Sequence, residues 1–469
     1  MTRREALRYL PALGALHLRG QNRSGAAAAP RPETFRIYTE TPRLLLRPQR
    51  LRLLRRERER RSLRWDQFET LWNASEPFPE LPWVQALRFQ VADDRDAGTR
   101  AVAWAVGPAD SARPDDLRQM AIIADWCESL ISGDDKRQLF AKLERAATDA
   151  RPAKDLGEAR SRLFAAVVLS EERAAVSQRS IEALLDGFWN NSFIASLRSA
   201  KSRVPNAEAY AMLEILHVVR DNLKFDLRDT LPDWFRQYPL LHLLAHYPAP
   251  WPGGENEFRI PADETIETTG PDVRKAALSR AAELAMVAYD ANAGSSQLLQ
   301  GWVMNDRFLL RGAFGIPYEF LWANPYQPGL SYYHAPLVLH DEIGGQLFVR
   351  SSWEDEASWL GFFSAQLQLF RNGEVTRMDP ASSREAVDVD SAIVFFARAA
   401  KRFTVSDSGA KEGDDGVAVF IVGLDPKRAY HVEIDGEEMT EEAADPGGIV
   451  YLQSVPPGGV RLAPAPALS

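Results

Sequence analysis

The sequence has almost no cysteine and no long apolar run. Its one cysteine, Cys127, excludes an intramolecular disulfide framework and a cluster of thiolate metal ligands. Cys127 lies in the apolar helical pattern AIIADWCE, so we interpret it as a buried structural thiol rather than a nucleophile. No uninterrupted apolar run reaches about 18 residues, so we expect no membrane span.

The chain also lacks the short motifs that mark several enzyme classes. It contains no Gly-x-Ser-x-Gly sequence, no Walker loop, no dinucleotide fingerprint and no zinc signature. The net charge of −9 argues against a general nucleic-acid binder, although a local basic cleft can still hold an acidic polymer. We therefore expect no nucleic-acid partner, no cofactor and no metal.

What is present is an ordinary globular composition, preceded by an unusual N-terminus. The 469 residues, 45% hydrophobic and 26% charged, leave room for two or three domains. In residues 1–30, Arg3 and Arg4 precede an apolar stretch at 10–18, and four alanines at 26–29 offer a cleavage site. This pattern resembles a twin-arginine export signal, with a disordered N-terminus as the alternative. An exported chain would be periplasmic or secreted.

Residues 31–334 carry a succession of helical patterns, in which apolar residues recur with a 3.6-residue period. The patterns cover 95–107, 114–132, 135–149, 156–170, 177–199, 206–222, 232–246, 271–293 and 295–322. The last is expected to break at Pro317. Helices of similar length with short connectors predict either an α-solenoid or a closed α/α toroid. An arginine-dense helix at 49–61 precedes them, and it is either a solvated helix or a surface for an anionic ligand.

After residue 334 the pattern changes to that of strands. Strand-like stretches begin near 337, 346, 358, 366, 392, 418, 430 and 448, and Arg371-Asn-Gly is a hairpin-turn signal. The predicted fold class is therefore α+β. An N-terminal α/α toroid-like helical domain (31–334) is followed by a C-terminal antiparallel β-sandwich-like domain (335–469).

Two segments resemble a known family. FVRSSWEDEASWLGFF at 348–363 is similar to the strand with an Arg-Ser-x-Trp character that opens the β domain of heparinase II/III-like polysaccharide lyases. PRLLLRPQRL at 42–51 resembles their first toroid segment. The resemblance implies an α/α toroid whose cleft, closed by the β domain, binds an acidic polysaccharide or oligosaccharide. It also implies cleavage by β-elimination at a uronic acid.

That reaction needs three groups. One neutralises the C5 carboxylate, a base removes the C5 proton, and an acid, usually tyrosine or histidine, protonates the leaving oxygen. Family members usually follow the tryptophan-rich strand with a His-Gly-His-like element. Here residues 362–373 occupy that place and contain no histidine.

The candidate catalytic residues are aromatic and histidine side chains near the domain boundary. Tyr332, Tyr333 and His334 follow a turn signal just before the β domain, where they either supply base and acid or pack between the domains. His246 and Tyr247 begin a long irregular segment that is a candidate cleft rim.

The candidate substrate-binding residues are spread over the helical domain. They are Asn190, Asn191, Arg220, His242, Trp251, Trp322 and Tyr326. His242 stands four residues before His246, but the glutamate of a His-Glu-x-x-His metal motif is missing. For the asparagines and tryptophans, a helix end and a packed core are the structural alternatives.

The leading hypothesis is an exported glycan-active protein that cleaves a uronate-containing polysaccharide. The first alternative is a carbohydrate-binding or scaffold protein on the same fold, without activity. The second is a toroid glycoside hydrolase, whose pair of carboxylates the sequence alone cannot select, because the required separation is spatial.

Overall fold

The computed structural model describes most of the chain after residue 34. The described residues are 35–200, 203–253, 256–263, 272–305, 312–324, 326–378, 386–397, 402–405, 417–436 and 438–465. The expected export signal at 1–30 lies outside them. Among the described helices, none combines the length and the apolar character needed to cross a membrane.

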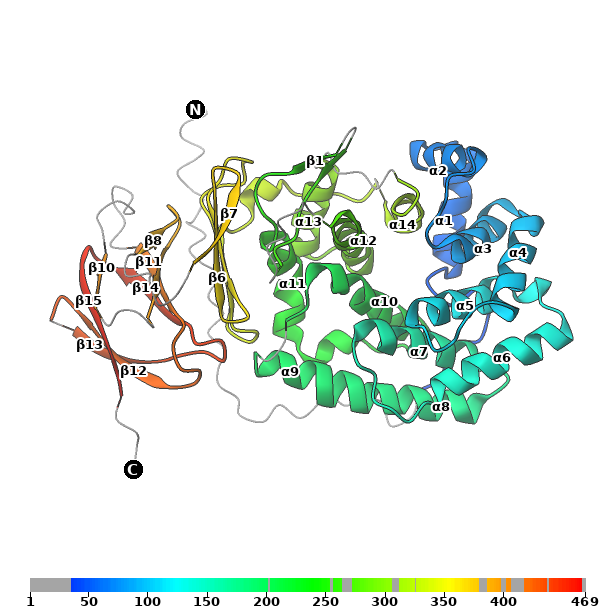
Figure 1. Cartoon of the computed structure of the whole chain (residues 1–469), viewed down its shortest axis with the longest axis horizontal. Coiled ribbons are helices and arrows are strands. Elements are labelled where there is room, and N and C mark those ends of the chain that lie inside the picture. The colour runs from blue at the N-terminus through cyan, green and yellow to red at the C-terminus, as the bar shows by residue number, and fades with distance from the viewer. Residues whose placement is uncertain are drawn as a thin grey trace.

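The N-terminal part of the chain, from Pro48 to Trp322, forms two concentric layers of helices (Figure 1). The inner layer consists of α1 (Pro48–Glu59), α3 (Leu81–Ala92), α5 (Pro114–Trp126), α7 (Leu156–Val168), α10 (Asn206–Leu223), α12 (Val273–Tyr289) and α14 (Ile316–Trp322). The outer layer consists of α2 (Leu63–Asn73), α4 (Arg95–Val106), α6 (Gly133–Ala147), α8 (Ala174–Ala183), α11 (Pro232–Leu244) and α13 (Gly294–Asn305).

The inner helices form a ring. Each contacts the next from α1 through α14, and α14 contacts α2, which packs on α1. Inner and outer helices alternate along the chain, and an outer helix packs on most of the inner ones. The toroid-like helical domain predicted from the sequence is confirmed.

Two differences from the predicted helices have local causes. The hydrophobic periodicity of the sequence does not predict α3. Eight of the twelve residues of this helix are buried, so it has no polar face that alternates with an apolar one at the helical period. The expected break at Pro317 is also misplaced. Pro317 lies in the first turn of α14, where a missing backbone N–H costs no hydrogen bond.

The C-terminal part of the chain, from Val338 on, forms three sheets. Their strands are β3 (Val338–Asp341), β4 (Gln346–Arg350), β5 (Trp359–Phe363), β6 (Gln366–Arg371) and β7 (Glu374–Met378) in the first sheet. The second holds β8 (Val387–Asp388), β9 (Ile393–Phe396), β11 (Val417–Val422) and β14 (Val450–Val455). The third holds β10 (Arg402–Val405), β12 (Ala429–Ile434), β13 (Glu438–Ala443) and β15 (Gly458–Pro464).

The pairing in these sheets is antiparallel, except that β9 and β11 run parallel. The hairpin predicted at Arg371-Asn-Gly joins β6 to β7. Asn372 and Gly373 there have φ values of 51° and 80°, as a two-residue turn with left-handed central residues requires. The predicted helical domain followed by a β-sandwich-like domain is confirmed.

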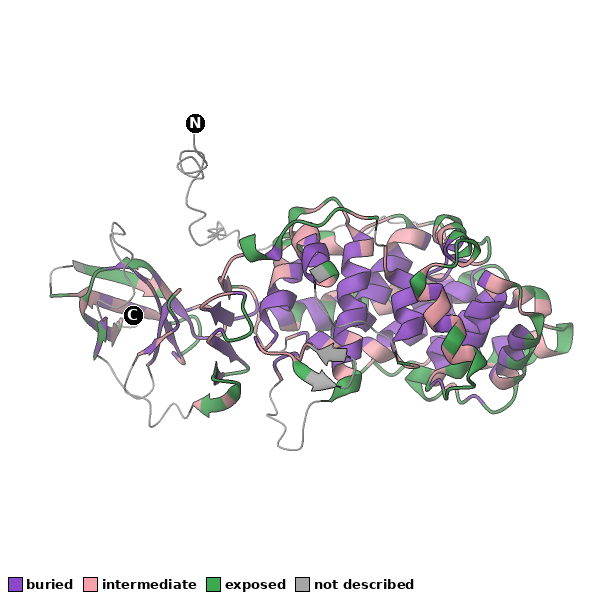
Figure 2. Cartoon of the chain, turned by 90° about the horizontal axis from the view of Figure 1, so that it is seen from above, coloured by how far each residue is buried: buried purple, intermediate pink, exposed green. Residues whose placement is uncertain are grey.

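The first sheet joins the helical domain to the second sheet. Phe348, Trp359 and Phe363 on one face belong to the same apolar core as the helices, whereas alternate residues such as Val349 and Leu360 face the second sheet. Buried residues accordingly fill the inward faces of the helices and extend into this sheet (Figure 2). The indole N–H of Trp359 also donates to the carbonyl of Leu244 at 2.8 Å.

Candidate functional site

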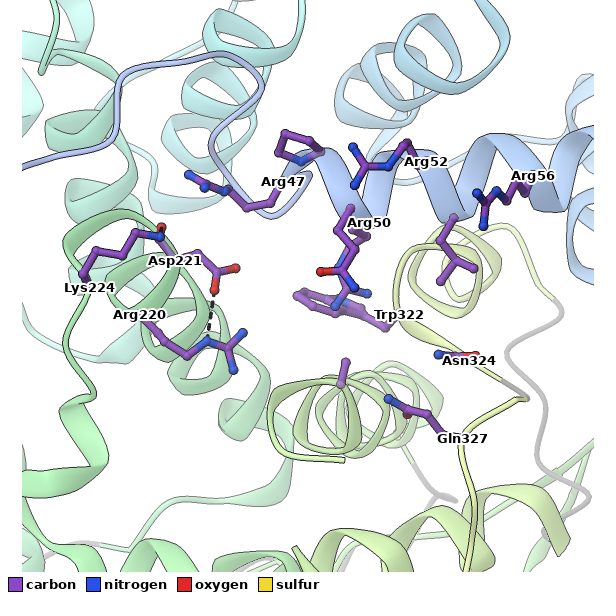
Figure 3. Close-up of a pocket in the computed structure, with 14 residues that line it drawn as sticks. Arg47, Arg50, Arg52, Arg56, Arg220, Asp221, Lys224, Trp322, Asn324 and Gln327 are labelled. Atoms are coloured by element: carbon purple, nitrogen blue, oxygen red, sulfur yellow. Dashed lines mark hydrogen bonds and ion pairs between the residues drawn. The ribbon is translucent and has the colours of Figure 1, made fainter. Parts of the chain in front are cut away.

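A pocket of about 850 Å³ opens at one end of the helical ring (Figure 3). The C-terminal ends of α10, α12 and α14 meet the N-terminal half of α1 there. We call it the arginine pocket. Its charged and amide lining residues are Arg47, Gln49, Arg50, Arg52, Arg56, Arg220, Asp221, Lys224, Asn324 and Gln327.

The charge of this lining is opposite in sign to that of the chain. Five arginines and one lysine face a single carboxylate, so the lining carries a net charge of +5 (six minus one), whereas the chain carries −9. A concave surface lined by one sign of charge concentrates ligands of the other sign. The arginine pocket is therefore suited to an anion.

Helix α1 supplies three of the six cations, and Arg47, which immediately precedes it, supplies a fourth. Leu51 and Leu54 are buried against the ring, while Arg52 and Arg56, four residues apart, lie together on the pocket side. The arginine-dense helix that was open to two interpretations in the sequence therefore has its apolar stripe in the core and part of its cationic face in a pocket.

Arg50 is a partly buried cation of the pocket. Its guanidinium donates to the carbonyl of Leu321 at 3.1 Å and lies 4.3 Å from the ring centre of Trp322. Burial lowers the pKa of Arg50 to about 10, with Asp221 and Arg220 acting in opposite directions, so the side chain is still a cation at neutral pH. Because α1 carries Arg50 and α14 carries Leu321, this side chain also closes the ring.

Arg220 and Lys224 are held by the ends of helices. Arg220 donates to the carbonyl of Tyr289 at 2.6 Å and to Asp221 at 3.0 Å, and Lys224 donates to the carbonyl of Asp221 at 2.9 Å. Cations at helix C-termini are favoured by the helix dipole, so these two side chains have a structural role in addition to any contact with a ligand.

Three cations have donors to spare. The guanidinium of Arg47 lies 3.4 Å from the ring centre of Tyr38, and its Nη1 is buried without a hydrogen-bond partner among the described residues. Arg52 and Arg56 are exposed and form no ion pair with any described residue. These three arginines are the ones available to bind an anionic group.

The lining has little capacity for proton transfer. Among the residues described there, none is a histidine or a tyrosine, and Asp221 is already paired with Arg220. The geometry supports the binding of an anion more directly than it supports catalysis.

Two of the predicted substrate-binding residues meet in this pocket. Arg220 comes from α10 and Trp322 from α14, more than one hundred positions apart in the chain. Trp322 is only 1% exposed and Arg50 covers its ring, so it forms a wall rather than a stacking platform. Tyr326 is 69% exposed and immediately precedes Gln327 of the lining.

The three residues of the predicted acid–base cluster lie in a single helical turn, η5 (Tyr332–His334), at the domain junction. Tyr332 is buried edge-on against Trp302, with ring centres 5.1 Å apart, and burial raises its pKa, which disfavours the phenolate. Tyr333 stacks on Tyr332 at 4.5 Å but is 52% exposed, and His334 is exposed. Only Tyr333 and His334 are accessible to a substrate.

The predicted histidine pair lies in the interior, where the fold adds a carboxylate. The Nε2 atoms of His242 and His246 lie 3.7 and 3.5 Å from Oε1 of Glu283, which α12 contributes. Burial lowers the pKa of His246 to about 4. Burial acts to raise the pKa of Glu283, but the neighbouring imidazole of His242 and the charge of Arg280 outweigh it and lower the value to about 2.

The other predicted residues lie elsewhere. The hydroxyl of Tyr247 donates to Gln368 of the first sheet at 2.8 Å, and Trp251 is about half exposed on a short strand, β1 (Trp251–Gly253). Asn190 and Asn191 lie on a π-helical segment, η3 (Leu184–Ile194), away from the arginine pocket.

Sequence reasoning did not select Arg47, Arg50, Arg52, Arg56 or Glu283 as individual site residues. The density of arginine at 47–61 was the available signal for the first four. Glu283 had none, because it stands 37 positions after His246 and is brought back only by the packing of α12.

The comparisons with known proteins contribute little to the assignment. No protein-family model matches the chain, and no curated protein matches it. Among solved structures, the chain is similar to one described as a glycoside hydrolase. The identity is 10%, the alignment covers 85% of this chain and 74% of that one, and the TM-score is 0.33. A likeness this distant carries no argument about activity.

Proposed function

We propose that this protein is a glycan-active protein that binds an acidic oligosaccharide or polysaccharide segment in the arginine pocket. The observation that supports the proposal is the excess of cations in the lining, six against one carboxylate, in a chain of net charge −9. Such a local reversal of charge indicates an anionic ligand more than it indicates a requirement of folding.

The lining suits the acidic groups of sugars. Arginine donates through a planar fork that matches carboxylate and sulfate oxygens, and Arg47, Arg52 and Arg56 have donors available. Asn324 and Gln327 add amide groups that can bond sugar hydroxyls. The volume of about 850 Å³ falls within the range of roughly 300–1,000 Å³ typical of ligand pockets.

Calorimetric titration of the full chain with uronate and sulfated oligosaccharides tests this function. Replacing Arg52 or Arg56 by alanine should weaken binding about tenfold or more, since a charge-assisted hydrogen bond contributes about 1.5–3 kcal/mol. Arg60→Ala is the matched control, because Arg60 ends the same helix, is exposed and does not line the pocket.

Two results would count against binding in this pocket. One is equal affinity in Arg52→Ala and Arg60→Ala. The other is the absence of heat with every acidic oligosaccharide of a broad panel.

The second candidate function is cleavage of the bound polymer by β-elimination, as the resemblance to the polysaccharide lyases implies. It is favoured by the exposed neighbours Tyr333 and His334, because tyrosine and histidine are residue types that serve as general acid and general base and these two lie in one helical turn. Gln327 of the pocket and Tyr332 are five positions apart, so their Cα atoms are at most about 18 Å from each other. A polymer held by the arginines would then extend toward that turn.

The formation of an unsaturated product, followed by its ultraviolet absorbance during incubation with uronate polymers, tests the elimination. Activity that is lost in Tyr333→Phe and His334→Ala, with binding in the arginine pocket retained, would support it. Binding without any product across the panel would instead favour a carbohydrate-binding or scaffold protein.

A further inference from the structure

A second cluster of chemically competent side chains lies away from the arginine pocket, inside the helical domain. His242 of α11, His246 just after it and Glu283 of α12 each place one ligand atom within 4.8 Å of the others. All three side chains are at most 2% exposed. Ser279, one helical turn before Glu283, places its hydroxyl 3.1 Å from His242 Nε2 and 3.0 Å from His246 Nε2.

These separations match the edges of a tetrahedron of metal ligands. Bonds of about 2.0–2.2 Å to nitrogen and oxygen give ligand–ligand distances of about 3.3–3.6 Å in tetrahedral zinc sites. The two Nε2 atoms lie 3.5 and 3.7 Å from Oε1 of Glu283. All three ligand atoms lie within 4.8 Å of one another, so side-chain adjustments can bring them to one ion.

The surroundings orient the ligands. His246 Nδ1 lies 3.0 Å from the carbonyl oxygen of His242 and donates to it, which leaves the Nε2 lone pair directed at the cluster. Oε2 of Glu283 accepts from Arg280 at 2.9 Å, so Oε1 is the oxygen that faces the histidines. Asn206 of α10 donates to the carbonyl of His242 at 3.0 Å and fixes the end of α11.

We propose that His242, His246 and Glu283 form a buried site for a divalent transition metal, with the Ser279 hydroxyl as the fourth ligand. Two imidazoles with oxygen ligands in a tetrahedral arrangement suit zinc. The site is closed on all sides by protein, which is the pattern of a structural metal rather than a catalytic one. It is independent of the function proposed for the arginine pocket.

The ion would join α11 to α12 next to the domain junction. Trp359 of the first sheet bonds the carbonyl of Leu244, two residues before His246, so a metal that fixes this end of α11 also fixes the surface on which the sheet rests.

Because the site is enclosed, the metal should enter during folding, and the test is a refolding experiment on the full chain. Protein refolded with Zn²⁺ and dialysed should retain one equivalent of zinc by elemental analysis. It should unfold several degrees higher than protein refolded with a chelator, because an ion that binds only the folded state stabilises it. Refolding with Co²⁺ should give the intense visible absorption of a tetrahedral cobalt site.

His246→Gln and Glu283→Gln should each lose the retained zinc. His340→Gln is the matched control, since His340 is also a buried histidine paired with a carboxylate, Asp445 at 2.8 Å, and should keep the metal. If the two cluster variants do not fold, the cobalt spectrum of the unaltered chain decides. Substoichiometric zinc, no cobalt absorption and identical unfolding with and without zinc would overturn the proposal and leave a hydrogen-bonded polar network.

Discussion

His217 lies behind the arginine pocket and both of its ring nitrogens are engaged. Nε2 donates to the carbonyl of Ala285 at 3.0 Å, and Nδ1 accepts from Arg220 at 3.2 Å. Burial, together with the charges of Arg220 and Arg50, holds the pKa of His217 well below 6.5. The neutral imidazole is therefore the form that the fold selects.

This gives a prediction about acid stability. Between pH 6.5 and 5 His217 becomes protonated in the unfolded chain but stays neutral in the folded chain. The contribution of His217 to the free energy of unfolding is therefore fully present above pH 6.5 and is lost as the pH falls. The contribution approaches about 1.4 kcal/mol per pH unit for one proton. His217→Gln should reduce the slope of unfolding free energy against pH by that amount, as measured by urea titrations. An unchanged slope would contradict the assignment.

At the scale of helices, the inner ring depends on one buried carboxylate. Glu214 of α10 accepts three hydrogen bonds from Arg118 of α5, at 2.6, 2.9 and 3.2 Å, and a fourth from Arg160 of α7 at 3.2 Å. The carboxylate of Glu214 and the guanidinium of Arg118 are almost entirely buried. Three inner helices therefore share one ionic centre.

Removing this carboxylate should cost more than removing a surface one. Glu214→Ala leaves the enclosed guanidinium of Arg118 without a counter-ion and leaves Arg160 only the exposed Asp115, 3.6 Å away. We therefore expect a loss of about 3–5 kcal/mol in unfolding free energy. Asp233→Ala is the control, because it breaks the exposed ion pair with Arg236 and should change stability by less than about 1 kcal/mol. Chemical denaturation of both variants measures the difference, and equal losses would contradict a hub at Glu214.

At the scale of the whole molecule, Trp359 couples the first sheet to the helical domain. It is fully buried, its indole bonds Leu244, and its ring packs against Tyr247 at 5.2 Å. Trp359→Ala should lower stability by about 3–5 kcal/mol through the cavity it leaves. It should also separate one calorimetric transition into two, because Trp359 is a large part of the core that the first sheet shares with the helices. A single transition at the original temperature would show that this contact does not couple them.

The opposition between a negative chain and a positive pocket gives a prediction about salt. Binding of an acidic oligosaccharide should weaken steeply as ionic strength rises from 0.1 M to 1 M, because the Debye length falls from about 10 Å to about 3 Å. The Arg52→Ala and Arg56→Ala variants should show a shallower dependence. Titrations at several salt concentrations measure this, and salt-independent binding would place the ligand elsewhere.

The sequence predicted the secondary-structure elements better than it predicted the residues of the sites. Periodicity found most of the helices, and the strand pattern with its Asn-Gly turn found the β domain, because both signals are local. It missed α3, where burial on all sides removes the period. The sequence placed Tyr332, Tyr333 and His334 next to one another, but it did not predict that Trp302 packs against Tyr332 and buries it.

The sequence by itself determined the order and type of elements, the change of class near residue 335 and the arginine-rich face of α1. Each depends on residues within one or two turns or one hairpin. Only the tertiary structure decided that the ring closes through Arg50 and Leu321, and that α10, α12 and α14 end where that face lies. It alone brought Glu283 to His242 and His246. These contacts depend on packing between helices that are far apart in the sequence, and no local sequence pattern encodes that packing.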